Sequence, residues 1–234
     1  MDFKHDGPNG LRLGLVVAEN VAPRLKSSQL DTLLAERLSA LQSGLTEAQD
    51  AFRASVRDVF RNGSYKPTGR AKPASEYLLR AAAESRFPRI NTLVDCCNYL
   101  SAASLLPISI WDLDLAEGTE YSFRLGREDE SYAFNNSGQS ISLKDLIVGC
   151  VADSEALERP IVNAVKDSMA TKTHDATTRI AAAIYAPLHE GPDLALEEVC
   201  SGFAQILGAA DSSPTDICTT VDHKIIFPGE IASF

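Results

Sequence analysis

The apolar positions of this chain first recur at helical spacing and later form strand-like runs. The clearest helical segment lies between residues 88 and 104, where side chains three or four positions apart share one face. Pro107 ends this pattern, because proline has no N–H and its ring clashes with the preceding turn. Residues 108–115 then alternate and are rich in branched side chains, so a strand is predicted there. The shared face of the helix is formed by Ile90, Leu93, Val94, Cys97, Leu100 and Ser104.

Weaker patterns of the same two kinds predict the elements around this centre. Thr46 and Gln49 form a capping-box pair that opens a helix, and Gly44 and Gly208 end helices. Arg124 is expected on the solvent face of its strand. In chain order, we predict a strand at 11–18, helices starting at Ser28 and Thr46, a helix at about 74–84, strands at 121–125, 147–152 and 179–186, and a helix with Pro192 as its first residue.

Three segments give weak signals: residues 126–138 are polar and turn-rich, residues 153–172 show no period, and residues 211–234 form a tail with a weak strand pattern at 224–227. Helices come first, strands follow and one helix comes last, without the regular alternation of a doubly wound sheet. We therefore predict an α+β fold. A single domain is expected over 1–234, with a core of about 60–210, a strand and helices of 1–59 packed on it, and the tail.

Composition narrows the class of protein. The chain has 234 residues with 44% apolar and 23% charged residues, which is ordinary for a globular protein. It has no run of the roughly 20 apolar residues that a membrane span needs, and its first ten residues do not resemble a signal peptide, so a cytoplasmic location is expected. The five cysteines have no CxxC spacing and the four histidines are scattered, so we expect no disulfide framework, no metal site and no cofactor.

Charge is distributed unevenly along the chain. The net charge of −10 argues against broad nucleic-acid binding, and DNA is not an expected partner. Residues 53–90, however, carry nine Lys or Arg and three Asp or Glu, a local charge of +6. Two interpretations stay open: a local phosphate-binding face, or solvated helix faces. The loop at 65–73 contributes Lys66, Arg70 and Lys72 to this segment.

Polar residues that can bind a ligand gather in two places. Residues 163–179 are dense in hydroxyls, amides and charges just before a predicted strand, which is typical either of a ligand site or of a turn-rich surface loop. Asp95 and Asn98 lie on the flank of the 88–104 helix, where they either tie the helix to a loop or line a pocket. His174 and Asp175 are adjacent and point to opposite sides of an extended chain, so they are not predicted to form a dyad.

Two segments resemble a known family. Residues 90–114 are similar to the signature of the tRNA-editing domain in the beta chain of phenylalanyl-tRNA synthetase, and residues 173–187 resemble its later acidic-threonine stretch. The resemblance covers about residues 60–210. The first signature is met by Val94, Asp95, Asn98, Tyr99, Pro107, Trp111 and Asp112.

The resemblance implies a PheT/TilS-like α+β domain of three layers, with a β-sandwich-like mixed sheet flanked by helices. It also implies hydrolysis, in trans, of the ester of mischarged tRNA, with Lys66, Arg70 and Lys72 on the tRNA backbone. Bacterial synthetases carry a functional histidine where this chain has Ser109, so a module that binds tRNA or an amino acid without catalysis is the alternative. The implied pocket residues are Asp95, Asn98, Ser109, Asn163, Lys166, Asp167, Ser168, Lys172 and Asp175.

Overall fold

The computed structural model describes residues 1–153, 155–209 and 219–234, so residues 211–218 of the predicted tail, which include Cys218, are outside the described part. The helices are α1 (Ser28–Gln42), α2 (Glu47–Val59), α3 (Ala74–Ala83), α4 (Thr92–Ser104), α5 (Leu113–Ala116) and α6 (Leu196–Gly208), with 3₁₀ turns η1 (Gly69–Ala71) and η2 (Met169–Thr171). The strands are β1 (Asp2–His5), β2 (Leu11–Glu19), β3 (Ile108–Asp112), β4 (Glu120–Leu125), β5 (Ser131–Ala133), β6 (Ser140–Ser142), β7 (Ile147–Ala152), β8 (Glu158–Asn163), β9 (Arg179–Pro187), β10 (Thr220–Ile226) and β11 (Ile231–Ser233).

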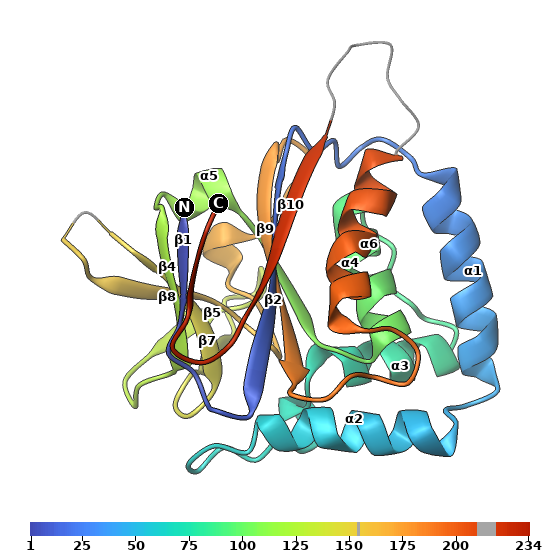
Figure 1. Cartoon of the computed structure of the whole chain (residues 1–234), viewed down its shortest axis with the longest axis horizontal. Helices are drawn as coiled ribbons and strands as arrows, with labels where there is room; N and C mark the ends of the chain where they lie inside the picture. The colour runs from blue at the N-terminus through green and yellow to red at the C-terminus, as the bar shows by residue number, and fades with distance from the viewer. Residues whose placement is uncertain (154, 210–218) are drawn as a thin grey trace.

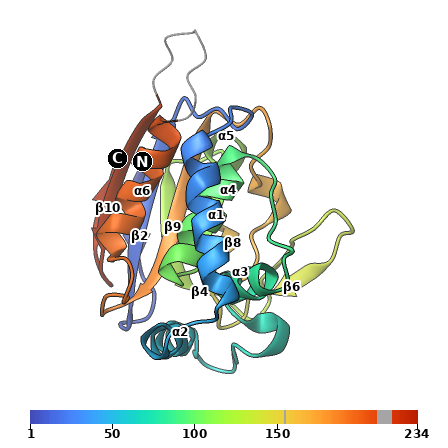
Figure 2. The same ribbon diagram turned by 90° about the vertical axis from the view of Figure 1, so that its right-hand side faces the viewer.

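Two sheets and a helical layer make up the molecule (Figure 1). One sheet has the order β11-β1-β4-β7-β8 and the other β10-β2-β9-β3; β5 and β6 form a separate hairpin. Helices α4 and α6 cover the outer face of the second sheet, α1 lies outside them, and α2 crosses below (Figures 1 and 2). The first sheet is mixed, because β1 pairs with β4 in parallel and its other pairs are antiparallel. This arrangement confirms the predicted α+β fold with mixed sheet and flanking helices.

The space between the sheets is filled by aromatic side chains. The rings of Phe3 and Tyr121 stack at 4.7 Å, and Trp111 lies 6.4 Å from Phe123. Phe123 in turn meets Tyr185 at 6.2 Å, so β1, β3, β4 and β9 all contribute to one cluster. Each aromatic side chain buries a large apolar area, and this cluster therefore holds the two sheets together.

On its other face, the second sheet lets α6 approach closely. A Cβ atom at Gly14 of β2 would lie 2.5 Å from Cys200 Sγ, a distance that real Cβ atoms do not show. The long runs of apolar residues in β2 and β9 follow from this double cover, since both faces of a central strand are buried.

Three predicted boundaries are wrong by a few residues. The strand expected at 108–115 ends at Asp112, whose Oδ1 accepts from the N–H groups of Asp114 and Leu115 and so starts helix α5. Helix α1 is capped by Ser27, not Ser28. The last helix starts at Leu196 and not at Pro192.

Strand β8 was not predicted, and its composition explains why. Its first half carries Glu158, Arg159 and Pro160, and only the second half is buried. Pro160 lies opposite the irregularity at Gly149/Cys150 of β7, on the edge strand of its sheet. Edges and bulges are the places where a sheet tolerates proline. Strand β1 and the β5–β6 hairpin were also missed.

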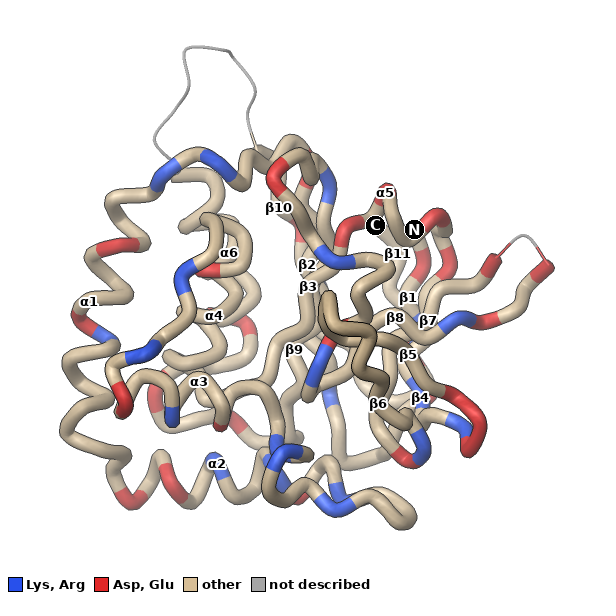
Figure 3. The backbone as a smooth tube through the Cα atoms, turned by 180° about the vertical axis from the view of Figure 1, so that it is seen from behind, with Lys and Arg blue, Asp and Glu red and all other residues tan. Residues whose placement is uncertain are grey.

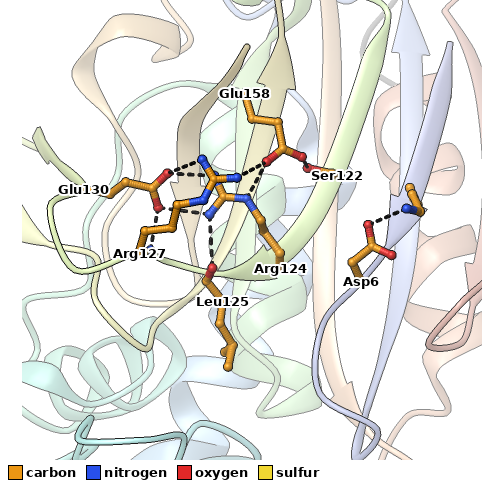
Figure 4. A network of polar contacts seen from close by, with 8 residues as sticks. Asp6, Ser122, Arg124, Leu125, Arg127, Glu130 and Glu158 are labelled. Carbon is orange, nitrogen blue, oxygen red and sulfur yellow. Dashed lines mark hydrogen bonds and ion pairs between the residues drawn. The ribbon is translucent and has the colours of Figure 1, made fainter. Parts of the chain in front are cut away.

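The sequence pattern predicted Arg124 on the solvent face of its strand, and this prediction is wrong. Its side chain is 12% exposed, and its guanidinium group lies between two carboxylates: Nε is 2.6 Å from Glu158 Oε2 and Nη2 is 2.7 Å from Glu130 Oε1 (Figure 4). Ser122 Oγ donates to the other oxygen of Glu158. Arg127 contacts both acids from outside. The network joins β4, β8 and the segment before β5.

His5 should make stability depend on pH. Its ring is fully buried, Nε2 donates to the Leu11 carbonyl at 3.0 Å, and Nδ1 accepts the Gly7 N–H, a pattern that fits only the neutral ring. Burial lowers the pKa of His5 below its ordinary value of 6.5. Because the unfolded chain then binds more protons, we expect the free energy of unfolding to fall as pH drops below about 6.5. Urea unfolding between pH 5 and 8 should show this fall, and a smaller one in His5→Gln; equal slopes would contradict it.

Candidate functional site

A group of polar side chains lies between the two sheets where β3 approaches β8. We call Ser109, Tyr132, Asn163, Asp167 and Tyr185 the polar cluster. Ser109 Oγ donates to the Asn163 carbonyl at 3.0 Å and lies 3.3 Å from the Tyr185 hydroxyl. These residues come from β3, β5, the end of β8, the turn after it, and β9. The structure thus brings Ser109, Asn163 and Asp167, three of the residues singled out from the sequence, close together.

The side chain of Asn163 shapes the turn that follows β8. Its Oδ1 accepts the N–H groups of Val165 and Lys166 at 2.7 and 2.8 Å, and its Nδ2 donates to the Tyr132 hydroxyl at 2.6 Å. Tyr132 then donates to the Lys166 carbonyl at 2.7 Å. Every polar atom of this buried amide is therefore used, and the β5–β6 hairpin is fixed to the turn. Burial raises the pKa of both Tyr132 and Tyr185.

Asp167 is the carboxylic acid of the polar cluster. Its Oδ2 accepts the Ile110 N–H in a long hydrogen bond of 3.4 Å. Ile110 is in β3, an edge strand that has free N–H groups. Oδ1 is buried and has no hydrogen-bond partner among the described residues. Burial raises the pKa of Asp167 to about 7, and the neighbouring Ser109 hydroxyl, the Ile110 N–H and Lys172 oppose this rise only in part.

The residues after Asp167 mostly face outward. Ser168 is buried and caps η2 by accepting the Ala170 N–H. Lys172 is exposed, and Asp175 is exposed and 3.4 Å from Arg24. These side chains do not join the polar cluster through any hydrogen bond or ion pair of the described residues, although the charge of Lys172 reaches Asp167.

The two sequence signatures meet at Asp112. Its Oδ2 accepts the Thr177 hydroxyl at 2.6 Å, and His174 Nε2 lies 3.6 Å from the same oxygen. His174 thus faces Asp112 and not its neighbour Asp175, in line with the expectation that the adjacent pair is no dyad. This contact fixes the segment before β9 to the end of β3.

Asp95 ties helix α4 to the preceding loop. Its Oδ2 accepts from Arg89 Nε at 2.7 Å and its Oδ1 accepts the Ile90 N–H at 2.8 Å; Arg89 also binds Asp31 of α1. Hydrogen bonds to Asp95 and Asp31 raise the pKa of Arg89. Asn98 is half-buried on the same helix. The α4 side chain directed at β3 is instead Cys97, whose Sγ lies 3.8 Å from the Ile108 carbonyl.

Two surface hollows share Lys166, whose backbone is hydrogen-bonded to Tyr132 and Asn163 of the polar cluster. One, of about 530 Å³, is bounded by the loop before α3 and the β5–β6 hairpin. The other, of about 870 Å³, runs between α1, α2 and α3. Arg70 and Lys166 line both, so the hollows meet there. Lys72 lines the larger one, and Lys66 is exposed in the same loop. Figure 3 shows blue stretches of Lys and Arg in the connection that follows α2.

In the larger hollow, one buried carboxylate holds three cations. Glu76 Oε2 forms ion pairs with three side chains. It lies 3.2 Å from Arg53 Nη1, 2.5 Å from Arg57 Nη2 and 3.6 Å from Lys72 Nζ. The basic segment was recognised from the sequence, but not that Glu76, one of its three acids, is the buried partner of three of its cations. The aromatic residues of the smaller hollow were missed as well, because the β5–β6 hairpin has the composition of a turn-rich loop.

Neither a metal site nor a membrane span is found in the described part of the chain. No three His, Cys, Asp or Glu side chains there gather as ligands would. Its helices are too short or too polar to cross a bilayer. Four cysteines (Cys96, Cys97, Cys150 and Cys200) are buried free thiols.

The family model of the B3/4 domain matches residues 65–188, more than half of the chain. This chain belongs to the B3/4 domain family. The resemblance found in residues 90–114 is therefore confirmed at the level of the domain family. The matched part of this B3/4 protein runs from the loop at the smaller hollow to the end of β9, and it includes the whole polar cluster.

Among solved structures, the B3/4 protein is similar to an N-terminal fragment of the phenylalanyl-tRNA synthetase beta subunit from Pyrococcus horikoshii, with 11% identity and a TM-score of 0.37. The similarity covers 59% of this chain and 43% of that one, so the chain spans less than half of the fragment. No curated protein matches the chain.

Proposed function

We propose that this B3/4 protein hydrolyses, in trans, the ester of wrongly aminoacylated tRNA. The observation that carries the proposal is the Asp167 carboxyl group, which has a pKa of about 7 and one oxygen without a hydrogen-bond partner in the described structure. A carboxyl group with a pKa near the working pH is suited to take a proton from water and to return it. The resemblance of residues 90–114 to the tRNA-editing domain of the phenylalanyl-tRNA synthetase beta chain supports the choice of substrate class.

Hydrolysis of an aminoacyl ester requires few catalytic groups from the protein. An aminoacyl ester is already activated, so a positioned water molecule and donors for the developing oxyanion suffice. In this proposal Asp167 accepts a proton from the water that attacks the ester carbonyl. It returns this proton to the ribose oxygen as the bond between that oxygen and the carbonyl carbon breaks. The Ser109 hydroxyl, beside Asp167, orients the water or the ester oxygen. No protein nucleophile is required. Lys66, Arg70 and Lys72 contact the tRNA backbone, and Lys166 connects their hollow to the polar cluster.

Access to Asp167 requires a local rearrangement. Its free oxygen is enclosed, and the turn η2 with the segment up to Thr177 follows it directly in the chain. The proposal therefore includes a displacement of residues 168–177 when tRNA binds. Asp95 and Asn98, on α4, then support the helix and the loop around the pocket; Asn163 and Ser168 shape the turn; Lys172 and Asp175 meet the substrate from the displaced segment.

The test is a deacylation assay with a panel of mischarged tRNAs. After subtraction of the uncatalysed rate, we expect activity to rise with pH and to level off above about 7, as Asp167 loses its proton. Asp167→Asn should lower the rate by about 100-fold or more, the usual contribution of a general base. The matched control Asp222→Asn changes an exposed carboxylate of β10, far from the polar cluster in sequence, and should keep the wild-type rate. Absence of turnover with every tRNA of the panel would end the proposal.

A second candidate function follows from the enclosure of Asp167. If the segment 168–177 stays closed, the protein is a tRNA- or amino-acid-binding module without catalysis, and the presence of Ser109 where bacterial relatives have a histidine supports this form. Saturable binding of tRNA, with no ester cleavage by the wild-type protein, would favour it over hydrolysis.

A further inference from the structure

The smaller hollow has an apolar floor and a cationic rim. The floor is formed by Tyr65, Phe134 and Ile141, and the rim by Arg70 and Lys166. Tyr65 and Ile141 pack on a small second core beneath the hairpin. A volume of about 530 Å³ is in the range of small-ligand sites. The hollow therefore offers flat apolar surface and positive charge to the same ligand.

Hydrogen bonds hold this arrangement in place. The Tyr65 hydroxyl donates to the Ala71 carbonyl, which fixes the ring against the η1 turn. Tyr132 donates to the Lys166 carbonyl and so sets the position of Lys166 from behind. The Lys166 ammonium group lies 3.8 Å from the centre of the Phe134 ring. The aromatic and cationic groups, which come from three separate segments, are thus presented together.

The rim cations have no acidic partner. Arg70 and Lys166 have no carboxylate within 4.0 Å among the described residues, and neither has Arg80 in the adjoining hollow. Most other arginines of the described chain do form ion pairs; Arg12, Arg37 and Arg179 are examples. In a chain of net charge −10, cations without a carboxylate partner that gather at one place indicate a site for an anion.

The two hollows together have room for a ligand longer than one nucleotide. Because the hollows share Arg70 and Lys166, a chain that leaves the smaller one enters a second cavity of about 870 Å³, where Arg80 is a further cation without a carboxylate partner among the described residues. Aromatic surface beside a cationic track is the pattern by which proteins hold single-stranded nucleic acid. Duplex RNA is read mainly by its shape and backbone, and its stacked bases cannot reach such a floor.

We propose that the smaller hollow seats one unstacked base of a single-stranded RNA end, with Arg70 and Lys166 on the flanking phosphates and the strand continuing into the larger hollow. This inference rests on the proposed function for tRNA as the source of that RNA end. It adds a specific subsite, built by the β5–β6 hairpin and the loop before α3, that lies outside the polar cluster.

Fluorescence anisotropy of a labelled single-stranded RNA, ACCA, tests the proposal with the full chain. We expect saturable binding, weaker binding of a 12-base-pair RNA duplex, and a Kd raised about 10-fold or more by Phe134→Ala, as stacking contributions predict. Arg70→Gln should weaken ACCA binding as well. The control Lys26→Gln removes the same charge at an exposed site before α1 and should leave the Kd unchanged. Since Arg70 is exposed, its variant keeps the test decisive even if Phe134→Ala fails to fold.

Three results would overturn the subsite: no saturable ACCA binding, tighter binding of the duplex, or equal Kd values for wild type, Phe134→Ala and Arg70→Gln. Failure of the proposed function looks different. If Phe134→Ala and Arg70→Gln weaken ACCA binding but no mischarged tRNA is cleaved, the proposed subsite is supported and the proposed hydrolysis is wrong. If both variants cleave mischarged tRNA with an unchanged KM, the proposed hydrolysis is supported and the proposed subsite is wrong.

Discussion

Replacing Trp111 with alanine is expected to lower the free energy of unfolding by about 4 kcal/mol, within the range of about 3–5 kcal/mol for buried tryptophan truncations. Trp111 is 1% exposed and contacts Phe3, Tyr121 and Phe123 between the two sheets. Its removal leaves a cavity that the paired strands around it cannot close. Trp111→Phe keeps most of the aromatic packing and should lose much less.

Urea unfolding followed by circular dichroism measures this effect, because Trp111 is the single tryptophan and the variants remove the fluorescence signal. A loss below about 1 kcal/mol in Trp111→Ala would show that the inter-sheet cluster does not hold the sheets together. In that case the aromatic position of the first signature would need another explanation, such as direct contact with a ligand.

Replacing Glu76 with glutamine is expected to destabilise the protein by about 3 kcal/mol, the lower end of the range for breaking a buried ion pair. The Glu76 side chain is 5% exposed and balances Arg53, Arg57 and Lys72. Without the carboxylate, three cations repel one another beside α3. The loss stays at the lower end because these cations are 28%, 21% and 39% exposed and keep part of their hydration.

The matched control is Glu36→Gln, an exposed acid of α1, which should change the free energy of unfolding by less than about 0.5 kcal/mol. Chemical denaturation of both variants at pH 7 and constant salt makes the comparison. Equal stability of Glu76→Gln and Glu36→Gln would contradict the role given to the buried carboxylate. It would also mean that the basic segment needs no internal counterion.

Sequence patterns predicted the elements that are stabilised by local interactions and the strands that are buried on both faces. Strand β7 was predicted at its observed bounds, and α2 was found through its capping box, which the structure contains. Missed elements depend on partners elsewhere in the chain. β8, with Pro160 at an edge irregularity, is a strand only because β7 pairs with it, and no local pattern carries that information.

The candidate site was predictable in part for the same reason. Asn163 and Asp167 were selected because polar side chains gather before a predicted strand, and Ser109 because it stands where bacterial synthetases carry a histidine. The sequence could not show that Ser109 and Asn163 share a hydrogen bond while Asp95 binds Arg89 on another side of α4. Phe134 gave no signal at all, because its hairpin is short and its neighbours are turn formers.

The two family signatures also gain a physical meaning. Asp112, in the first, accepts a hydrogen bond from Thr177, in the second. The two signatures are therefore connected in the structure by a contact between the end of β3 and the segment before β9.

The pairing of β2 with β9 has a consequence for biosynthesis. Leu11 lies opposite Pro187 and Glu19 opposite Arg179, so the central strand near the start of the chain is completed by residues near its end. Contacts of such long sequence separation slow folding, because a large loop must close first. During translation, β2 must wait until β9 has left the ribosome, and its apolar surface is open to chaperones or to misfolding for most of that time.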